Sequence, residues 1–528
     1  MKRFKTLYIA SAVAMLLSTT SCEKYLTEEP STSFSANFIY NTPEGLDMGV
    51  VALYNLNRSF YENGEWNFAV PFLLQAKTDL VLGRTGEASL YSTLAWGATL
   101  GDFGTTRYSH YWKTYYKIID RSNAIIKYGA NIQMDEAKRN ELLAQAKFFR
   151  AHSYFILYKL FNNIYITTEP TTPENASNIV TDKSSMEDIF KLIEEDLDFA
   201  RNNLKWETSQ PGRVSKGTAT HVRAQVALWK EENEKALELA KEVIQSGHHN
   251  LLPNTSDVFK GDLNHKESLF VIQYKAQTFG GGVPHRFNFL LLPQYGATPG
   301  AQYDNAMGGR GAGFLLLNDY FRDLLNEDPL DNRAKGSYYI STFYFNNPST
   351  LPPGKKIGDI IDTYDEMSSN TADRNLFYAR LNPGCLKFSN ETGLPNEVDQ
   401  AKNIMVYRLS ETYLIAAEAA WKLNLESEGL EYINAVRSRA KASPIIQLSL
   451  KAILDEDARE LGFEGQRWYT LKRLGVTGQQ MSKYAGNSRN GLYQANARTL
   501  FQAHMVNLPI PQSEINLLGP NYPQNDGY

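Results

Sequence analysis

The densest group of chemically capable side chains lies near the C-terminal end of the sequence. Arginines and carboxylates alternate there with large apolar residues: Arg459, Glu460, Glu464, Arg467 and Arg473 interleave with Leu461, Phe463, Trp468 and Leu471. Such groups can act in catalysis, or they can form charge-assisted hydrogen bonds away from water. Because the charges crowd around two glycines and a tryptophan, we interpret the run as arginines packed on rings and paired with partly buried carboxylates. The pattern predicts a structural network rather than a catalytic group.

Motifs of known enzyme classes are missing from the sequence. It contains no G-x-S-x-G, no P-loop, no H-E-x-x-H and no paired C-x-x-C. His248 and His249 follow a predicted helix, where imidazole suits exposed carbonyl groups better than a metal, and Cys385 is predicted to be a small buried apolar residue. A glycosidase would need two carboxylates about 5–10 Å apart, and no pair stands out. We predict no catalytic residue, no metal and no cofactor.

The beginning of the chain has the layout of a secretory signal. Three basic residues among the first five precede an uncharged apolar run, residues 7–17, and small residues then lead to Cys22. The run is too short for a permanent membrane helix. A cysteine in this place is where a bacterial lipoprotein signal would be cut, so we expect residues 1–21 to be removed and Cys22 to carry several acyl chains. The alternative is an ordinary secretory signal in which Cys22 is incidental.

The composition narrows the class of protein further. Apolar residues make up 42% of the 528 residues, which is ample for a core and excludes wholesale disorder. Loss of residues 1–21, which hold three positive and no negative charges, would take the formal net charge from −4 to −7. This balance argues against a nucleic-acid partner and against a polybasic membrane surface. With Cys22 modified, Cys385 has no partner for an internal disulfide.

Helical periodicity dominates both ends of the chain. Three alanine-spaced helix pairs can be traced: residues 136–161 with 186–204, 218–230 with 233–246, and 404–424 with 427–441. Small residues let paired helices approach closely, as in tetratricopeptide (TPR) units. The spacing of the pairs is irregular. The sequence therefore predicts a mainly α fold, a scaffold of TPR-like helical hairpins interrupted by long loop-rich insertions.

The largest insertion covers about residues 251–403 and has no sustained period. It is rich in Gly, Pro, Asn and Tyr, and a shorter aromatic-rich loop region lies between Tyr61 and Tyr111. Loops of such length are usually functional or are structured by packing. We expect one domain over residues 22–528, with TPR-like helices at about 40–250 and 404–475 and the insertion facing a ligand.

Several segments, in order along the chain, carry a family pattern. They are S-C-E-K-Y-L (21–26), A-K-F-F-R-A (146–151), Y-R-L-S-E (407–411), A-A-E-A (416–419), I-N-A-V-R-S-R-A (433–440), E-L-G-F-E-G-Q-R-W (460–468), L-P-I-P-Q-S-E-I (508–515) and Q-N-D-G-Y (524–528). In this order they resemble the SusD/RagB family of outer-membrane lipoproteins that help to capture glycans. Gly462 departs from the pattern, since alanine is usual there.

The resemblance implies a fold, a partner and a location. The fold would be mostly helical with TPR-like units, and the partner a SusC-like TonB-dependent transporter over which the lipoprotein sits as a lid. The protein would be held to the outer membrane by its lipid and would face the cell exterior. It would bind an oligosaccharide without catalysis and pass it to the transporter.

The aromatic residues of the loops are suited to sugar binding, because the C–H face of a pyranose complements the face of an aromatic ring. Our ligand-binding candidates, chosen by loop position and chemistry, are Asp79, Arg84, Trp96, Tyr295, Tyr303 and Phe314. For each ring the alternative is simple core packing. Two other functions remain open, a structural lid with negligible sugar binding and a surface glycosidase.

Overall fold

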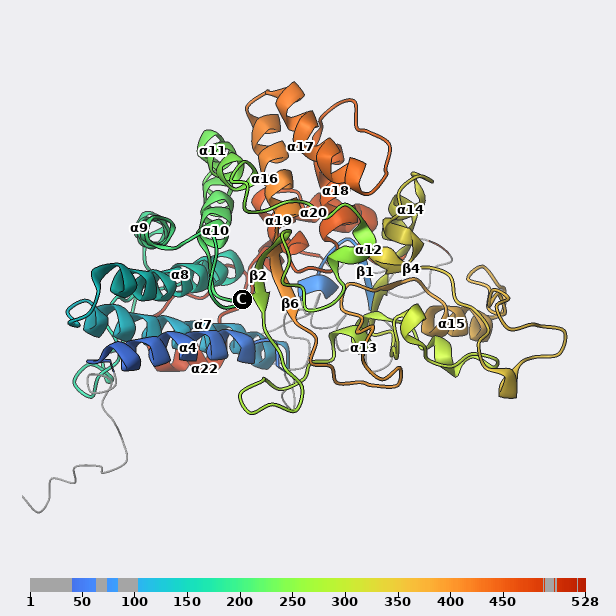
Figure 1. The fold of residues 1–528 in the computed structure, drawn as a ribbon, viewed down its shortest axis with the longest axis horizontal. Helices are drawn as coiled ribbons and strands as arrows, with labels where there is room; N and C mark the ends of the chain where they lie inside the picture. Colours follow the sequence, from blue (N-terminus) through green and yellow to red (C-terminus); the bar gives the residue numbers. More distant parts are fainter. Residues whose placement is uncertain are drawn as a thin grey trace, which may run out of the picture.

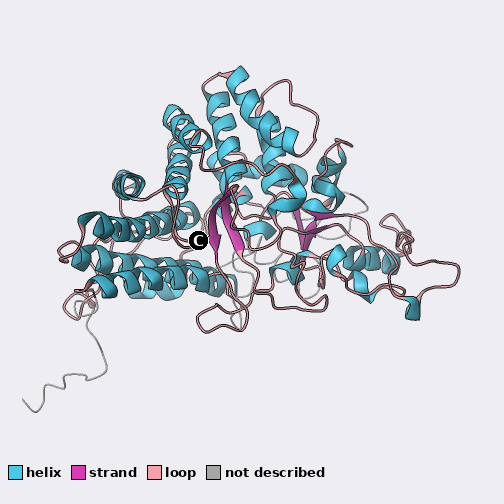
Figure 2. Ribbon diagram, viewed as in Figure 1, coloured by secondary structure: helices cyan, strands magenta, loops and turns pink. Residues whose placement is uncertain are grey.

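The computed structural model describes residues 40–62, 74–83, 103–487, 489, 498, 501–519 and 521–528. Helices dominate it (Figure 2), so the expectation of a mainly α, TPR-like fold is confirmed. The first layer holds α4 (Pro43–Ser59), α7 (Phe103–Gly129) and α8 (Glu136–Phe161), which lie side by side at the left of Figure 1. Helix α9 (Met186–Asn203) packs against α8.

Local capping explains where these helices begin. Thr42 accepts a hydrogen bond from the Gly45 N–H at 3.0 Å, and a proline occupies the first turn of α4. The cap of α9 is Ser185, which accepts from the Asp188 N–H at 3.0 Å. Residue 184 is also a serine, but its hydroxyl accepts from the Ile166 N–H at 2.9 Å and so ties down the preceding loop.

Two further hairpins rise from this layer. They consist of α10 (Lys216–Trp229) with α11 (Asn233–Ile244), and α16 (Leu409–Lys422) with α17 (Glu426–Arg439). Helix α11 packs directly on α16, although the insertion separates them in sequence. Fully buried alanines at this contact, such as Ala240 and Ala416, allow the close approach. The three helix pairs expected from the alanine spacing are therefore present.

The chain after α17 closes the scaffold. It forms α18 (Leu450–Leu461), α19 (Arg467–Arg473), α20 (Thr477–Tyr484) and α22 (Gln512–Leu518). The final segment returns to the first layer, where Glu514 lies 3.5 Å from Lys113 and the Leu508 N–H donates to the Leu160 carbonyl at 2.8 Å. Within the described ranges, no helix combines the length and the apolar character that a bilayer crossing requires.

The strands of the described residues form three antiparallel pairs (Figure 2, magenta). These are β1 (Val81–Gly83) with β3 (Leu315–Leu317), β2 (Ser268–Ile272) with β6 (Ile404–Arg408), and β4 (Tyr339–Ile340) with β5 (Gly384–Cys385). The pair β2–β6 joins the two ends of the insertion. Residues 404–408, expected to begin a helix, are a strand because they pair with β2.

The rest of the insertion is built from short elements. Its helices are α12 (Thr255–Val258), α13 (Phe287–Leu291), α14 (Asp319–Asn326) and α15 (Thr371–Arg380), and single turns lie at Tyr295–Ala297, Asn305–Met307, Arg333–Ser337 and Pro348–Thr350. A last turn, Ala503–Val506, lies outside the insertion. The part from α13 to α15 extends to the right of the helical scaffold in Figure 1. It has its own small core around Leu292, Tyr295 and Phe343.

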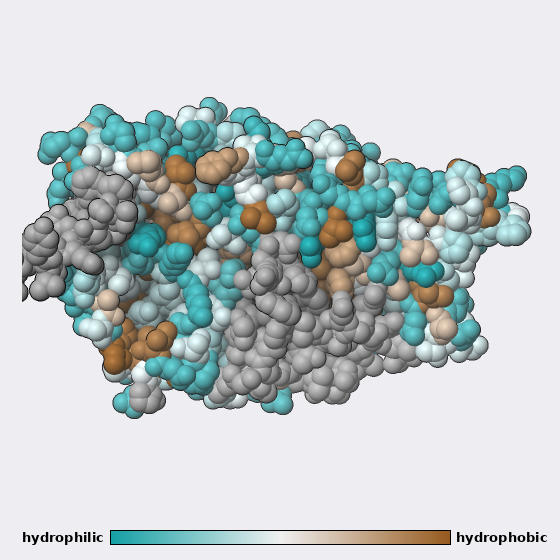
Figure 3. Space-filling view, turned by 90° about the horizontal axis from the view of Figure 1, so that it is seen from below, coloured by the Kyte–Doolittle hydropathy of each residue, from teal (hydrophilic) through white to brown (hydrophobic). Residues whose placement is uncertain are grey.

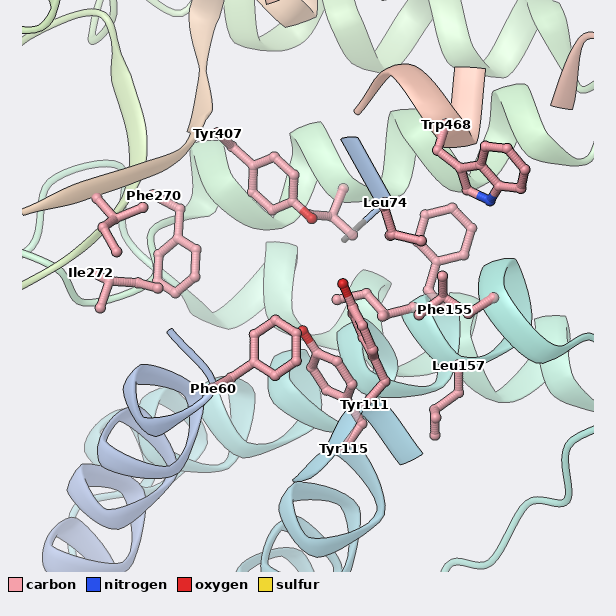
Figure 4. Packing of buried hydrophobic residues seen from close by; sticks show 14 of the residues in the cluster. Phe60, Leu74, Tyr111, Tyr115, Phe155, Leu157, Phe270, Ile272, Tyr407 and Trp468 are labelled. Carbon is pink, nitrogen blue, oxygen red and sulfur yellow. The ribbon is translucent and has the colours of Figure 1, made fainter. Parts of the chain in front are cut away.

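Many of the aromatic residues belong to the main core. Figure 4 shows Phe60, Tyr111, Tyr115, Phe155 and Tyr407 converging from α4, α7, α8 and β6. All of them are buried. The high aromatic content of the chain is thus largely explained by packing between the helical layer and the strand pair β2–β6, and only the remaining rings are available to a ligand.

Candidate functional site

The charged run near the C-terminal end forms a buried ion-pair network. At its centre is Glu460 of α18, which accepts hydrogen bonds from Arg408 Nη1 at 2.5 Å and from Arg333 Nη1 at 2.9 Å. Arg439 of α17 also donates to Glu460. Burial alone would raise the pKa of Glu460, but these three guanidinium groups hold the pKa well below its usual value.

Other carboxylates complete the network and join distant segments. Glu267 accepts from Arg408 at 3.0 Å and from Arg439 at 2.8 Å, and Glu464 accepts from Arg408 at 2.7 Å. Lys387 of the insertion donates to Glu464 at 2.6 Å. The network, defined as Glu267, Arg333, Lys387, Arg408, Arg439, Glu456, Glu460 and Glu464, therefore fastens the insertion to β6, α17 and α18.

A substrate could not reach this network. Glu267, Glu456 and Glu460 have no exposed surface, and the arginines of the network are nearly as buried. Every charge in it has an opposite charge within hydrogen-bonding distance. The interpretation of the charged run as a structural network is confirmed.

Asp79, one of the candidate ligand residues, belongs to a similar buried pair. Arg467 of α19 donates to both of its carboxylate oxygens, at 2.9 Å from Nε and 2.6 Å from Nη2. Asp79 has no exposed surface. Its carboxylate is therefore occupied in holding the segment before β1 to α19, and the expectation that it faces a ligand is corrected.

Tyr295 is also buried, in the core of the insertion. Its ring stacks on Phe343 with centroids 5.0 Å apart, and its hydroxyl donates to the Asp304 carbonyl at 3.0 Å. The same hydroxyl accepts from the Asp304 N–H at 2.8 Å. With no exposed surface, Tyr295 supports its neighbours, so this expectation is corrected as well.

Tyr303 and Phe314 are half-buried and contribute to what we call the aromatic surface, Phe289, Tyr303, Phe314 and Tyr364. Tyr303 rests edge-on against Tyr295, with ring centroids 5.3 Å apart. Phe314 meets Phe289 edge-on at 6.3 Å. Tyr303 therefore stands on a buried ring, and Phe289 and Phe314 support each other, which fixes the orientation of these three rings.

Two arginines lie among these rings. The Arg310 guanidinium carbon is 5.8 Å from the centre of the Phe289 ring. Arg380, at the end of α15, donates from Nη1 to the Tyr364 hydroxyl at 2.6 Å. Burial raises the pKa of Tyr303, and the positive charges of Arg310 and Arg380 oppose that rise. The aromatic surface therefore lies beside two positive charges.

The strand pair β1–β3 brings the two predicted loop regions together. Phe314 directly precedes β3, and Leu315 pairs with Gly83 at the end of β1. Arg84 is the next residue in the chain. Arg84, Trp96 and Cys22 lie outside the described residues and stay predictions. Sequence reasoning missed Phe289, Arg310, Tyr364 and Arg380, because nothing in their local sequence separates them from core or solvent-exposed residues.

Two other reactive side chains of the described residues, Cys385 and His248, lie in packed surroundings. Cys385 is fully buried, and burial raises the pKa of its thiol to about 12, which keeps it protonated. The described residues hold no cluster of three or more His, Cys, Asp and Glu side chains that could bind a metal. His248 lies against Trp206, with ring centroids 5.4 Å apart.

A groove of about 450 Å³ runs between α4 and β2, lined among others by Met48, Val51, Tyr54 and Phe270. Met48 and Val51 are exposed. Figure 3 shows the molecule from below, and hydrophobic residues appear there as separate patches among hydrophilic ones. Arg58 and Arg213 also line the groove, and the Arg213 guanidinium carbon lies 5.2 Å from the centre of the Tyr54 ring.

These features define a class of protein: a TPR-like helical scaffold whose loop-rich insertion presents aromatic rings and arginines on a rigid base. Comparison with known families gives the affiliation. Residues 328–528 match the SusD family, and residues 24–228 match a family described as "Starch-binding associating with outer membrane". The chain belongs to the SusD/RagB family.

Similar proteins extend over nearly the whole chain. A SusD-like protein of Formosa agariphila is 26% identical over 549 residues, covering 100% of both chains, and one of Bacteroides ovatus is 24% identical, covering 88% of this chain and 82% of its own. A solved laminarin-binding SusD-like protein is 24% identical, with a TM-score of 0.69 over 93% of this chain and 100% of the other. Surface glycan-binding protein A from Bacteroides thetaiotaomicron, solved with laminarihexaose, is 20% identical, with a TM-score of 0.69 over 92% and 99%.

Proposed function

We propose that this protein is a non-catalytic, cell-surface glycan-binding lipoprotein. It captures oligosaccharides and passes them to a SusC-like TonB-dependent transporter in the outer membrane. The observation that carries the proposal is the aromatic surface, where half-buried rings are fixed by packing and arginines lie beside them. The family and the ligands named for two similar structures support the class of ligand.

The energetics of the aromatic surface suit reversible capture. If each ring stacks on a sugar with about 0.5–1.5 kcal/mol, two or three rings supply part of the roughly 4 kcal/mol of millimolar binding. Hydrogen bonds from arginine and amide side chains supply the rest. Because Tyr303 is held by Tyr295, little side-chain entropy is lost on binding. Modest affinity lets the protein release its cargo to the transporter.

The absence of catalysis is supported by the groups near the rings. Tyr303 lies near two guanidinium groups, and the neighbouring Asp304 uses its carboxylate to accept from the Ala306 N–H at 2.8 Å. A glycosidase needs one protonated and one ionised carboxyl group facing the same bond. The rings and arginines can hold a sugar but offer it no acid.

The anchor and the transporter complete the proposal. Acyl chains on Cys22 would hold the protein at the outer membrane with its binding surface exposed to the exterior. The aromatic surface belongs to the part of the chain that extends away from α4, α7 and α8 (Figure 1). The helical hairpins are thus free to contact the transporter while the insertion holds the glycan.

Binding to a polysaccharide panel, measured by calorimetry with the purified full chain, tests the proposal. We expect heat with at least one glycan, a weaker signal for Tyr303→Ala and Phe314→Ala, and no reducing ends released. Phe279→Ala is a matched control, because Phe279 is fully exposed on a loop outside the aromatic surface. Co-purification with a barrel but no heat with any glycan favours a structural lid. Turnover that a single carboxylate substitution abolishes favours a glycosidase.

A further inference from the structure

Within the described residues, the two arginines beside the aromatic surface, Arg310 and Arg380, have no ion-pair partner of the kind that nearby arginines have. Arg322 pairs with Glu366, and Arg286 pairs with Asp399 at 2.7 Å. In the described part of the chain, neither Arg310 nor Arg380 has a carboxylate within 4.0 Å. Arg310 is exposed and Arg380 is half-buried. Two guanidinium groups from separate elements thus remain available beside the same rings.

Both guanidinium groups are held in place by rings. Arg310 lies over Phe289, and Arg380 is fixed by the Tyr364 hydroxyl at 2.6 Å and by the Tyr364 ring, whose centre is 5.6 Å from its guanidinium carbon. A guanidinium has five N–H donors in a rigid plane, which match the paired oxygens of a carboxylate or a sulfate. Since Arg380 gives one donor to Tyr364, most donors of the two side chains are free for a ligand.

We propose that the aromatic surface selects an anionic glycan, one that carries uronate carboxylates or sulfate esters. The inference rests on the proposed glycan binding and adds the charge class of the ligand. Rings would stack on the sugar faces, while Arg310 and Arg380 would pair with the acidic groups on either side of Tyr303. A neutral sugar would leave both guanidinium groups to water.

The charge of the whole chain makes these two residues decisive. The formal net charge is −4, so an anionic polymer gains no general attraction from the protein. The nearest carboxylate in sequence to the surface tyrosine, Asp304, accepts from the Ala306 N–H at 2.8 Å and forms no ion pair with Arg310. Binding of an anion would therefore depend on local contacts and would weaken as salt screens them.

The test uses two polymers and their matched neutral forms. Polygalacturonate is compared with its carboxyl-reduced form, and a sulfated galactan with its desulfated form, by affinity electrophoresis of the full chain at low and high salt. We expect one charged polymer to bind and its neutral form to bind at least about tenfold more weakly. The two pairs distinguish a carboxylate from a sulfate as the recognised group.

Variants locate the binding. Arg310→Ala and Arg380→Ala together should weaken binding of the charged polymer about tenfold and remove most of its salt dependence. Lys356→Ala is the control, because Lys356 is an exposed cation of the same insertion that lies outside the aromatic surface. Unchanged thermal unfolding of the double variant would show that its fold is intact.

The outcomes separate the two proposals. Equal or tighter binding of the neutral forms, or full binding by the double arginine variant, overturns the anionic inference and leaves glycan binding standing. Binding to none of the four polymers, together with binding to a neutral glycan of the wider panel, also overturns it. Binding to no glycan of any kind overturns the proposed function itself.

Discussion

Replacement of Glu460 by glutamine tests the buried ion-pair network. Glu460 has no exposed surface and accepts hydrogen bonds from Arg333, Arg408 and Arg439. Glutamine keeps the size of the side chain but removes the negative charge. It also presents an amide group to donors, which leaves at least one N–H directed at a guanidinium.

The expected loss follows from the partners that remain. Breaking a buried ion pair by removing one partner costs about 3–5 kcal/mol. Arg333 keeps Glu456, and both Arg408 and Arg439 keep Glu267, so we expect a loss near the lower limit. With an unfolding entropy of about 2.1 cal/mol/K per residue, a chain of this length loses about 3 °C of Tm for about 3 kcal/mol.

Calorimetric melting of Glu460→Gln against the wild type measures this loss. The control is Glu238→Gln, because Glu238 is 64% exposed and pairs with Lys235 on the surface of α11; its loss should stay below about 1 kcal/mol. If Glu460→Gln melts within about 1 °C of wild type, as the control does, the conclusion that the network holds the insertion to the helical scaffold is refuted.

Three more predictions follow from buried groups. Burial lowers the pKa of Lys159 to about 7. Above that pH the unfolded state binds more protons than the folded state, so the free energy of unfolding should rise from about pH 7 to 10. Urea titrations should show a smaller rise for Lys159→Met. Acid should also destabilise the protein through Glu460. Because the folded pKa of Glu460 is lowered, its stabilisation is complete above about pH 4.3 and is lost as pH falls through the folded value. Glu460→Gln should therefore show a smaller loss of stability on acidification. Gly462→Ala restores the residue that is usual in the family. It should lower the free energy of unfolding by about 1–3 kcal/mol, because the added methyl would lie 2.6 Å from the Ala458 carbonyl oxygen. An unchanged melting temperature would contradict this.

The helices could be predicted because their signals are local. Alanine and leucine spacing gave residues 136–161 as one helix, and α8 has these bounds. The spacing predicts too early a start for α16, because residues 404–408 form a strand by pairing with β2, more than a hundred residues away in sequence. Local periodicity carries no information on such a partner.

The candidate site was predicted less well for the same reason. Asp79 and Tyr295 were selected for their loop positions, yet Arg467 and Phe343 bury them. Each of these partners lies far from the candidate in sequence. Tyr303 and Phe314 do reach the surface of the molecule. Burial depends on contacts between distant segments, so loop position and residue type alone separate a core ring from a surface ring poorly.

The most direct test of the account is a crystal structure of the protein with an oligosaccharide that binds it. We expect sugar rings stacked on Tyr303 or Phe314, with Arg310 and Arg380 within hydrogen-bonding distance of the ligand. Sugar density confined to another place, such as the groove between α4 and β2, would contradict it.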